Sequence, residues 1–110
     1  MQNDPKANIS RYLENLSIAA LNTMQEVTFE KATSAKNMML LAPTGSGKTL
    51  AFLLPLLHQL TPEDTGVQAL IVAPSRELSL QIEQVFRTMK TSYKVSCCYG
   101  GHSVKVRKTA

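Results

Sequence analysis

The sequence has no tryptophan, few aromatic residues and only two cysteines, and these shortages exclude several classes of protein. Cys97 and Cys98 are neighbours, so they cannot form a disulfide framework, and they lack the spacing of metal ligands. We expect them to be reduced cysteines on a buried strand. The longest unbroken apolar run, Leu50 to Leu57, has eight residues. A helix that crosses a bilayer needs roughly 20, so a membrane-spanning helix is excluded.

The start of the chain lacks the charged-then-apolar order of a signal peptide, so we expect a cytoplasmic protein without a membrane partner. With 110 residues, of which 44% are apolar, the chain can bury the core of one small domain at most. Internal repeats and low-complexity tracts are also lacking, which argues against a repeat architecture and against disorder.

Acidic residues are missing from the last part of the chain. Positions 87–110 hold six basic residues and no acidic one, whereas positions 1–86 hold six basic residues and all eight acidic ones. The net charge of +4 therefore arises after position 86. This basic segment is either a solvated face or a source of non-specific contacts with phosphates. Aromatic residues do not interleave the basic run after Lys105, so a base-stacking platform is not expected.

Hydrophobic spacing predicts an alternation of helices and strands. Helical periodicity over residues 9–21 predicts a first helix, and the capping-box pair of Thr23 and Glu26 predicts a second helix up to about Ala35. Short continuous apolar runs predict strands that are buried on both faces. These strands are expected at residues 38–41, 69–72 and 94–99, with helices at 48–60 and 74–86. The order predicts an α/β fold with a parallel sheet flanked by helices, which binds ligands at the carboxyl ends of its strands.

The segment 42–49, with the sequence APTGSGKT, follows the first predicted strand and precedes an apolar helix. Gly45 and Gly47 let the backbone adopt conformations closed to other residues and bring N–H groups close to phosphate oxygens. The N-terminus of the following helix adds partial positive charge. In such loops the lysine, here Lys48, reaches the β- and γ-phosphates, and the hydroxyl of the next residue, here Thr49, binds Mg²⁺. The segment is therefore predicted to be a phosphate-binding P-loop (Walker A).

With alanine in its first position, this loop resembles the nucleotide loop of the DEAD-box ATP-dependent RNA helicases. The segment PSRELSLQ, residues 74–81, resembles the family motif Pro-Thr-Arg-Glu-Leu-Ala-x-Gln. Gly100-Gly101 falls where the family has its GG motif, and residues 21–25 (LNTMQ) align with its glutamine motif. The resemblance extends over about residues 10–108, nearly the whole chain.

The resemblance implies a RecA-like P-loop NTPase fold that uses ATP and Mg²⁺ and contacts the RNA backbone without reading its sequence. The nucleotide-binding residues that it implies are Gln25, Thr44, Gly45, Ser46, Gly47, Lys48 and Thr49. Among them, Gln25 would recognise adenine and Thr49 would bind Mg²⁺. The RNA-binding residues that it implies are Pro74, Ser75, Arg76, Gly100 and Gly101.

Simpler interpretations stay open for three of these features. Gln25 would otherwise be an ordinary exposed helix residue. Arg76 would form a structural ion pair with Glu77, and the glycine pair at 100–101 would be a plain turn.

The Asp-Glu-Ala-Asp motif, which supplies the Mg²⁺-binding carboxylates of the resembled family, does not occur in this sequence, and neither does its Ser-Ala-Thr motif. We therefore expect residues 1–110 to be a truncated part of the first RecA-like domain, without catalytic residues and without the second RecA-like domain. Such a chain would bind ATP and RNA without hydrolysing ATP alone, and its incomplete sheet would favour self-association.

The function predicted from the sequence is therefore that of a part of an ATP-dependent RNA helicase. Two alternatives stay open. One is a P-loop ATPase or DNA helicase of another family, and the other is a non-catalytic module that binds nucleotides or nucleic acids.

Overall fold

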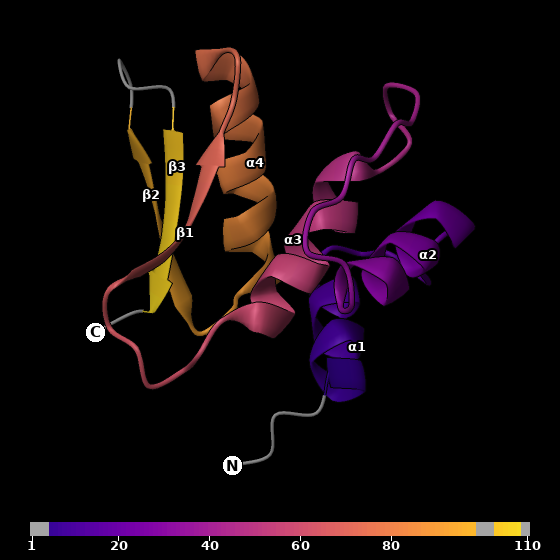
Figure 1. Cartoon of the computed structure of the whole chain (residues 1–110), viewed down its shortest axis with the longest axis horizontal. Helices are drawn as coiled ribbons and strands as arrows, with labels where there is room; N and C mark the ends of the chain where they lie inside the picture. The colour runs from indigo at the N-terminus through magenta and orange to yellow at the C-terminus, as the bar shows by residue number, and fades with distance from the viewer. Residues whose placement is uncertain (1–4, 99–102, 109–110) are drawn as a thin grey trace. The chain divides into compact units, whose positions relative to one another are not determined.

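The computed structural model of the chain describes residues 5–98 and 103–108, with side-chain surroundings for residues 8–98. Contacts between residues divide the chain into two compact units, Met1–Gln59 and Leu60–Ala110. Helices α1, α2 and α3 belong to the first unit, whereas helix α4 and strands β1, β2 and β3 belong to the second (Figure 1). Within the described residues, no helix combines the length and the apolar character needed to cross a membrane.

Helix α1, Pro5–Asn15, confirms the first predicted helix but ends six residues before the predicted boundary at position 21. The backbone reverses at Ser17, which has a φ of 60°. There the N–H of Ile18 donates to the Leu13 carbonyl at 2.9 Å and that of Ser17 to the Glu14 carbonyl at 3.1 Å. This pair of bonds satisfies the last carbonyls of the helix, as in a Schellman motif. A left-handed serine is unusual at this place, which is why the sequence pattern did not predict the stop.

Helix α2, Thr23–Ala32, begins where it was predicted, but its cap is formed by other residues. Asn22 is the N-cap, and Gln25 is its capping-box partner, one position before the predicted pair of Thr23 and Glu26. An asparagine caps a helix as well as a serine does, and better than a threonine, so the prediction chose the weaker of two neighbouring signals. Helix α2 packs against α3, where the rings of Phe29 and His58 lie 5.5 Å apart.

The strand predicted at residues 38–41 is wrong, because this segment has no regular secondary structure. Met39 and Leu41 are 83% and 85% exposed, so the apolar run is not buried on either face. A run of apolar residues forms a strand only where other strands pair with it, and such long-range partners cannot be read from the run itself. Helix α3, Lys48–Gln59, follows the loop as predicted and buries six of its residues, including Pro55 inside the helix.

The second unit holds a three-stranded sheet in the order β1-β3-β2. Its strands are β1, Val67–Val72; β2, Tyr93–Cys98; and β3, Ser103–Lys108. β3 pairs antiparallel with both neighbours, with Val106 opposite Ala69 on one side and Val95 on the other. The predicted parallel ladder is therefore wrong for the described residues, although β1 and β2 run in the same direction on either side of β3.

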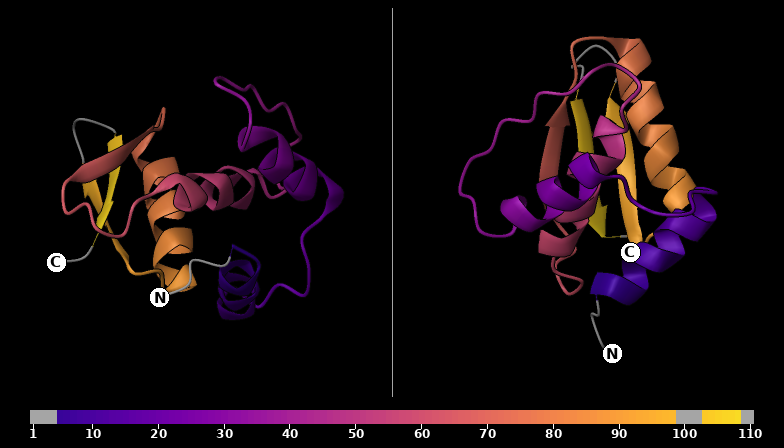
Figure 2. Two further views of the ribbon diagram at one scale, coloured as in Figure 1. Left: turned by 60° about the horizontal axis from the view of Figure 1, so that its bottom comes forward. Right: turned by 90° about the vertical axis from the view of Figure 1, so that its right-hand side faces the viewer.

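Strand β3 was not predicted. Because it lies between β1 and β2 and runs opposite to both, the expected parallel pairing is replaced by two antiparallel ones. Its sequence, SVKVRK, alternates valines with polar and basic residues, which is the pattern of a half-buried strand rather than of a charged tail. Helix α4, Arg76–Met89, runs along one face of the sheet and contacts β2 and β3 (Figure 2). Ile82, Phe86 and Met89 of α4 are buried, as is Val95 of β2. These apolar side chains form the core of the second unit.

Candidate functional site

The loop between residue 41 and α3 turns tightly at its two inner glycines. Gly45 has a φ of 81° and Gly47 a φ of 91°, a region that other residues rarely adopt. Pro43 closes the turn, because its carbonyl accepts the N–H of Ser46 at 3.3 Å and the hydroxyl of Ser46 at 2.6 Å. The prediction that both glycines are needed for their backbone conformation is confirmed.

Lys48 connects the end of the loop to its beginning. Its Nζ donates to the carbonyl of Ala42 at 2.7 Å, and the side chain is half-buried. The ammonium group therefore lies over the loop rather than in open solvent. Lys48 is also the first residue of α3, whose first turn carries no acidic side chain. A positive helix terminus and an ammonium group thus act on the same loop, which is the electrostatic setting that favours a phosphate.

The N-terminus of α2 lies against this loop and holds it with two side-chain amides. Nε2 of Gln25 donates to the carbonyl of Gly47 at 3.2 Å, and Nδ2 of Asn22 donates to the carbonyl of Ser46 at 3.0 Å. Gln25 is only 5% exposed, so the interpretation of it as an ordinary exposed helix residue is wrong. The glutamine motif and the P-loop are brought together, as the resemblance implied.

Two hydroxyl groups complete the loop. Thr44 is exposed at its tip, and Thr49 is partly exposed in the first turn of α3. A Mg²⁺ ion prefers oxygen ligands, and the hydroxyl of Thr49 is such a ligand in the first turn of α3. Within the part of the chain that the structure describes, no group of three or more His, Cys, Asp or Glu residues could hold a metal ion.

The PSRE segment belongs to the second unit, where it begins α4. Ser75 is the N-cap, and its Oγ accepts the N–H of Leu78 at 3.2 Å. Pro74, Arg76 and Glu77 are exposed around it. The side chain of Ser79 is buried and donates back to the Ser75 carbonyl at 3.2 Å. The predicted glycine pair at 100–101 lies outside the described residues.

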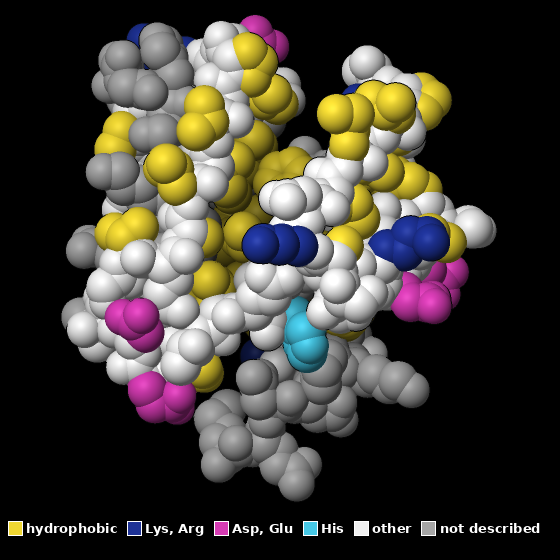
Figure 3. All heavy atoms as spheres, in the orientation of Figure 1, with side chains coloured by type: hydrophobic (Ala, Val, Ile, Leu, Met, Phe, Trp, Pro, Cys, Tyr) yellow, Lys and Arg dark blue, Asp and Glu magenta, His cyan; other side chains and the backbone are white. Residues whose placement is uncertain are grey.

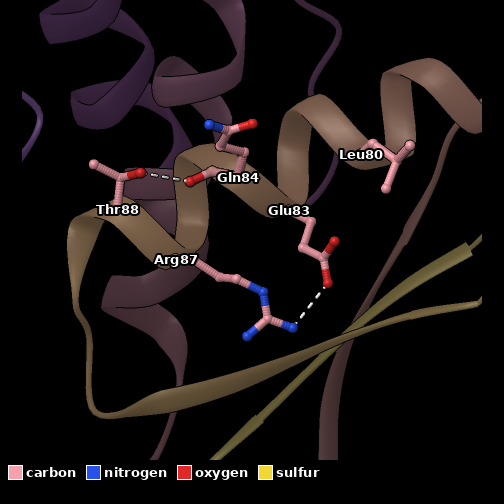
Figure 4. Close-up of a pocket in the computed structure, with 5 residues that line it drawn as sticks. All are labelled: Leu80, Glu83, Gln84, Arg87 and Thr88. Atoms are coloured by element: carbon pink, nitrogen blue, oxygen red, sulfur yellow. Dashed lines mark hydrogen bonds and ion pairs between the residues drawn. The ribbon is translucent and has the colours of Figure 1, made fainter.

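A further hollow lies along α4 and was not predicted. It is lined by Leu80, Glu83, Gln84, Arg87 and Thr88 (Figure 4). The close-up shows Glu83 and Arg87 turned toward each other, with a 2.8 Å ion pair between their side chains. Arg87 also donates to the carbonyl of Val95 on β2 at 3.4 Å. Spacing of four residues between opposite charges on a helix is the sequence signal for this pair.

Cys97 of β2 lies within the electrostatic influence of these charges. Burial raises the pKa of its thiol above the ordinary value of 9.0, the carboxylate of Glu83 and the thiol of Cys98 raise it further, and Arg87 opposes them. Both cysteines are free thiols, as predicted, but they are half-buried, so the prediction that they lie on a buried strand is wrong. A raised pKa keeps the thiol protonated at neutral pH, which is the state of a structural rather than a nucleophilic cysteine.

Comparison with known proteins places the loop in a family. A sequence model described as DEAD/DEAH box helicase matches residues 22–110. The pre-mRNA-processing ATP-dependent RNA helicase PRP5 of Saccharomyces cerevisiae (strain YJM789) is 39% identical over 105 residues, covering 87% of this chain and 12% of the relative. The DEAD-box ATP-dependent RNA helicase CshA of Streptococcus pneumoniae serotype 4 is 37% identical over 101 residues, covering 90% of this chain and 19% of the relative.

A third relative, the probable ATP-dependent RNA helicase YfmL of Bacillus subtilis, is 40% identical over 84 residues, covering 74% of this chain and 22% of the relative. The chain thus spans between 12% and 22% of the length of these three relatives. No solved structure gives a significant match to the chain.

Proposed function

The chain belongs to the DEAD/DEAH box helicase family, and on that basis we propose that it carries the nucleotide-binding loop and part of the RNA-binding surface of an ATP-dependent RNA helicase. One observation carries the proposal. The loop with two positive-φ glycines begins a helix, holds the Lys48 ammonium over itself, and lies against Gln25 of the glutamine motif.

The loop would bind the phosphates of ATP through main-chain N–H groups at the start of α3. Gly45 and Gly47 present no side chain that would block the approach of a phosphate, and the acid-free first turn of α3 does not repel it. Lys48 would exchange the Ala42 carbonyl for phosphate oxygens, which are stronger acceptors because they are charged. Mg²⁺, when bound, neutralises phosphate charge, and Thr49 would be its protein ligand in this chain.

Gln25 would recognise the base. A primary amide both donates and accepts hydrogen bonds, which matches the adenine edge that presents one donor beside one acceptor. Its proximity to the loop supports this role, because the Gly47 carbonyl and the Gln25 amide are 3.2 Å apart.

The start of α4 would bind the RNA backbone. The hydroxyl of Ser75 accepts the N–H of Leu78 through its oxygen, which leaves its own O–H as a donor for a phosphate oxygen. Arg76 adds an exposed guanidinium group in the first turn of the helix. Contacts of this kind fix the position of RNA without reading its sequence. Pro74, Gly100 and Gly101 would shape the neighbouring backbone.

We propose that this 110-residue chain binds ATP without hydrolysing it, because its sequence lacks the Asp-Glu-x-Asp carboxylates on which phosphoryl transfer in the family depends. The test is calorimetric titration of the chain with ADP and with ATPγS in the presence of Mg²⁺, for the wild type, Lys48→Ala and Lys36→Ala. Lys36 is an exposed lysine outside the loop and serves as the matched control.

Lys48→Ala is expected to weaken nucleotide binding at least about 10-fold, because it removes a charge-assisted hydrogen bond. Lys36→Ala should bind like the wild type. Equal binding by all three proteins would overturn the assignment of the loop, and turnover of ATP by the wild-type chain would overturn the claim that it does not hydrolyse ATP.

A further inference from the structure

Asn22 forms two kinds of hydrogen bond, and only one of them belongs to a helix cap. Its Oδ1 accepts the N–H of Gln25 at 2.8 Å, while its own N–H donates to Oε1 of Gln25 at 3.0 Å. This reciprocal pair is a capping box, and a serine or an aspartate at position 22 would accept the Gln25 N–H equally well. The amide nitrogen of Asn22 is therefore not required by the cap.

That amide nitrogen contacts the P-loop instead. Nδ2 of Asn22 donates to the carbonyl of Ser46 at 3.0 Å, across 24 positions of sequence. Among the residues that favour a helix N-cap, aspartate has no donor group, and the hydroxyl of serine or threonine lies one bond closer to the backbone than Nδ2 of asparagine, so none of the three places a donor where Nδ2 lies. The choice of asparagine thus adds a contact with the loop to the capping function.

The direction of the Ser46 carbonyl determines the direction of the next N–H group. The chain has no cis peptide bond among its described residues, and in a trans peptide the C=O and the following N–H point in opposite directions. A Ser46 carbonyl held toward α2 therefore turns the N–H of Gly47 away from α2. The next carbonyl, that of Gly47, is held by Nε2 of Gln25 and by the N–H of Ala51. Two successive N–H groups, those of Gly47 and Lys48, then point away from the α2 side of the loop.

We propose that Asn22 is a positioning residue of the phosphate loop, which holds the Ser46 carbonyl and thereby aims the Gly47 N–H at a bound phosphate. The inference rests on the proposed function, since it takes the loop to be the phosphate site. Glycine at position 47, with its φ of 91°, has little steric preference of its own, so an external contact is needed to fix the peptide that precedes it.

The experiment compares three variants of the whole chain: Asn22→Ser, Asn22→Asp and Asn22→Ala. The first two keep the capping oxygen and remove the amide donor, whereas Asn22→Ala removes both. Thermal unfolding of Asn22→Ser should stay within about 2 °C of the wild type, and Asn22→Ala should unfold at a lower temperature. The capping and positioning effects are thereby separated.

The first readout needs no ligand. The ¹⁵N heteronuclear NOE of the Gly47 and Lys48 amides reports their order on the ps–ns timescale. It should fall in Asn22→Ser and Asn22→Asp, while the amides of the α3 interior stay unchanged. The second readout is calorimetric binding of tripolyphosphate, which has the phosphates of ATP without the base, so the role of Gln25 toward adenine does not enter.

Tripolyphosphate affinity is expected to fall about 3- to 10-fold in Asn22→Ser, in line with the loss of one hydrogen bond. Asn22→Asp should lose more, because it also places a negative charge beside the loop. If Asn22→Ser binds tripolyphosphate as tightly as the wild type does, the positioning role is overturned and the proposed function is left intact. A wild-type chain that binds neither tripolyphosphate nor ADP would overturn the proposed function, and the inference with it.

Discussion

Gly47 and Gln25 are in such close contact that a side chain at position 47 would collide with the glutamine. A β-carbon built on Gly47 would lie 2.5 Å from Nε2 of Gln25 and 3.5 Å from its Cδ. A β-carbon built on Gly45 would meet no atom within 4 Å. Both glycines have a positive φ, 81° for Gly45 and 91° for Gly47. Backbone strain on substitution is therefore common to the two positions, and the steric conflict belongs to Gly47 alone.

The first prediction follows from this difference. Gly45→Ala should lower the free energy of unfolding by about 1–2 kcal/mol, the cost of a left-handed alanine. Gly47→Ala should lower it by about 1–3 kcal/mol more, since the methyl group must displace the Gln25 amide. Urea unfolding of both variants measures the two losses. Equal losses would show that Gln25 moves aside without cost, and would contradict the contact described here.

The second prediction concerns the N-cap of α4. Ser75→Ala should lower the free energy of unfolding by about 1 kcal/mol, because the N–H of Leu78 loses its acceptor. Ser75→Asp keeps an acceptor and should be as stable as the wild type. Under the proposed function both variants should bind single-stranded RNA more weakly, Ser75→Asp because its carboxylate repels phosphates. Chemical unfolding and fluorescence anisotropy with a labelled RNA separate the two effects; unchanged RNA binding by Ser75→Asp would remove Ser75 from the RNA-binding surface.

The third prediction concerns the thiol of Cys97. Its pKa lies above 9.0, first because of burial and then because of the Glu83 carboxylate. In a Cys98→Ser background, Glu83→Gln should lower that pKa and speed alkylation by iodoacetamide at pH 8.5, because a larger fraction of the thiol is then ionised. Arg87→Gln should slow alkylation, because it removes the opposing positive charge.

The matched control is Glu77→Gln, which neutralises an exposed carboxylate of the same helix and should leave the rate unchanged. Since the thiol of Cys97 ionises at a higher pH in the folded than in the unfolded chain, the free energy of unfolding should decrease as the pH rises above 9.0 toward the raised pKa. A rate of alkylation that is insensitive to Glu83→Gln would contradict the electrostatic contribution of Glu83.

The fourth prediction concerns the exposed segment before the P-loop, where hydrophobic side chains cover the surface (Figure 3). We propose that it supports self-association, because Met39 and Leu41 are 83% and 85% exposed. Replacing both by serine should shift the chain toward monomer in sedimentation velocity, with a change in unfolding free energy within about 0.5 kcal/mol. The comparison is Leu70→Ser with Val72→Ser on β1, which are 57% and 73% exposed. Dissociation by the β1 pair alone would assign the association to the sheet instead.

Helices were predictable from the sequence because each carries its own signals. Helix α4 has an apolar stripe and a serine N-cap within its own segment, and the structure begins the helix at Arg76. Strands depend on partners that are distant in sequence. The run at 38–41 was apolar enough for a strand but pairs with none of the strands that the structure describes, whereas the alternating segment 103–108 pairs with two. The antiparallel direction of the ladders is a property of such pairings, and local periodicity does not determine it.

The candidate site was predictable where backbone geometry requires a residue type. The glycines at 45 and 47 have the positive φ that the loop was expected to need. The family resemblance implied only that Gln25 and the loop bind the same nucleotide, and the hydrogen bond between Gln25 and the Gly47 carbonyl, 22 positions away, was not predicted. Asn22 was recognised as part of the glutamine motif but not as a cap or as a contact of Ser46. The pattern Asn-x-x-Gln before a helix was the signal that would have identified the cap.

The amide of Gln25 already has partners on both sides within the chain: the N–H of Asn22 for its oxygen and the carbonyl of Gly47 for its nitrogen. Under the proposed function, adenine would use the second lone pair of Oε1 and the second N–H of Nε2, which these two internal bonds do not use. The internal bonds would meanwhile hold the amide in one orientation before the base arrives, so little rotational freedom of the Gln25 side chain would be lost on binding. A base with donor and acceptor exchanged relative to adenine would meet the amide the wrong way round, because turning the amide over would break both internal bonds.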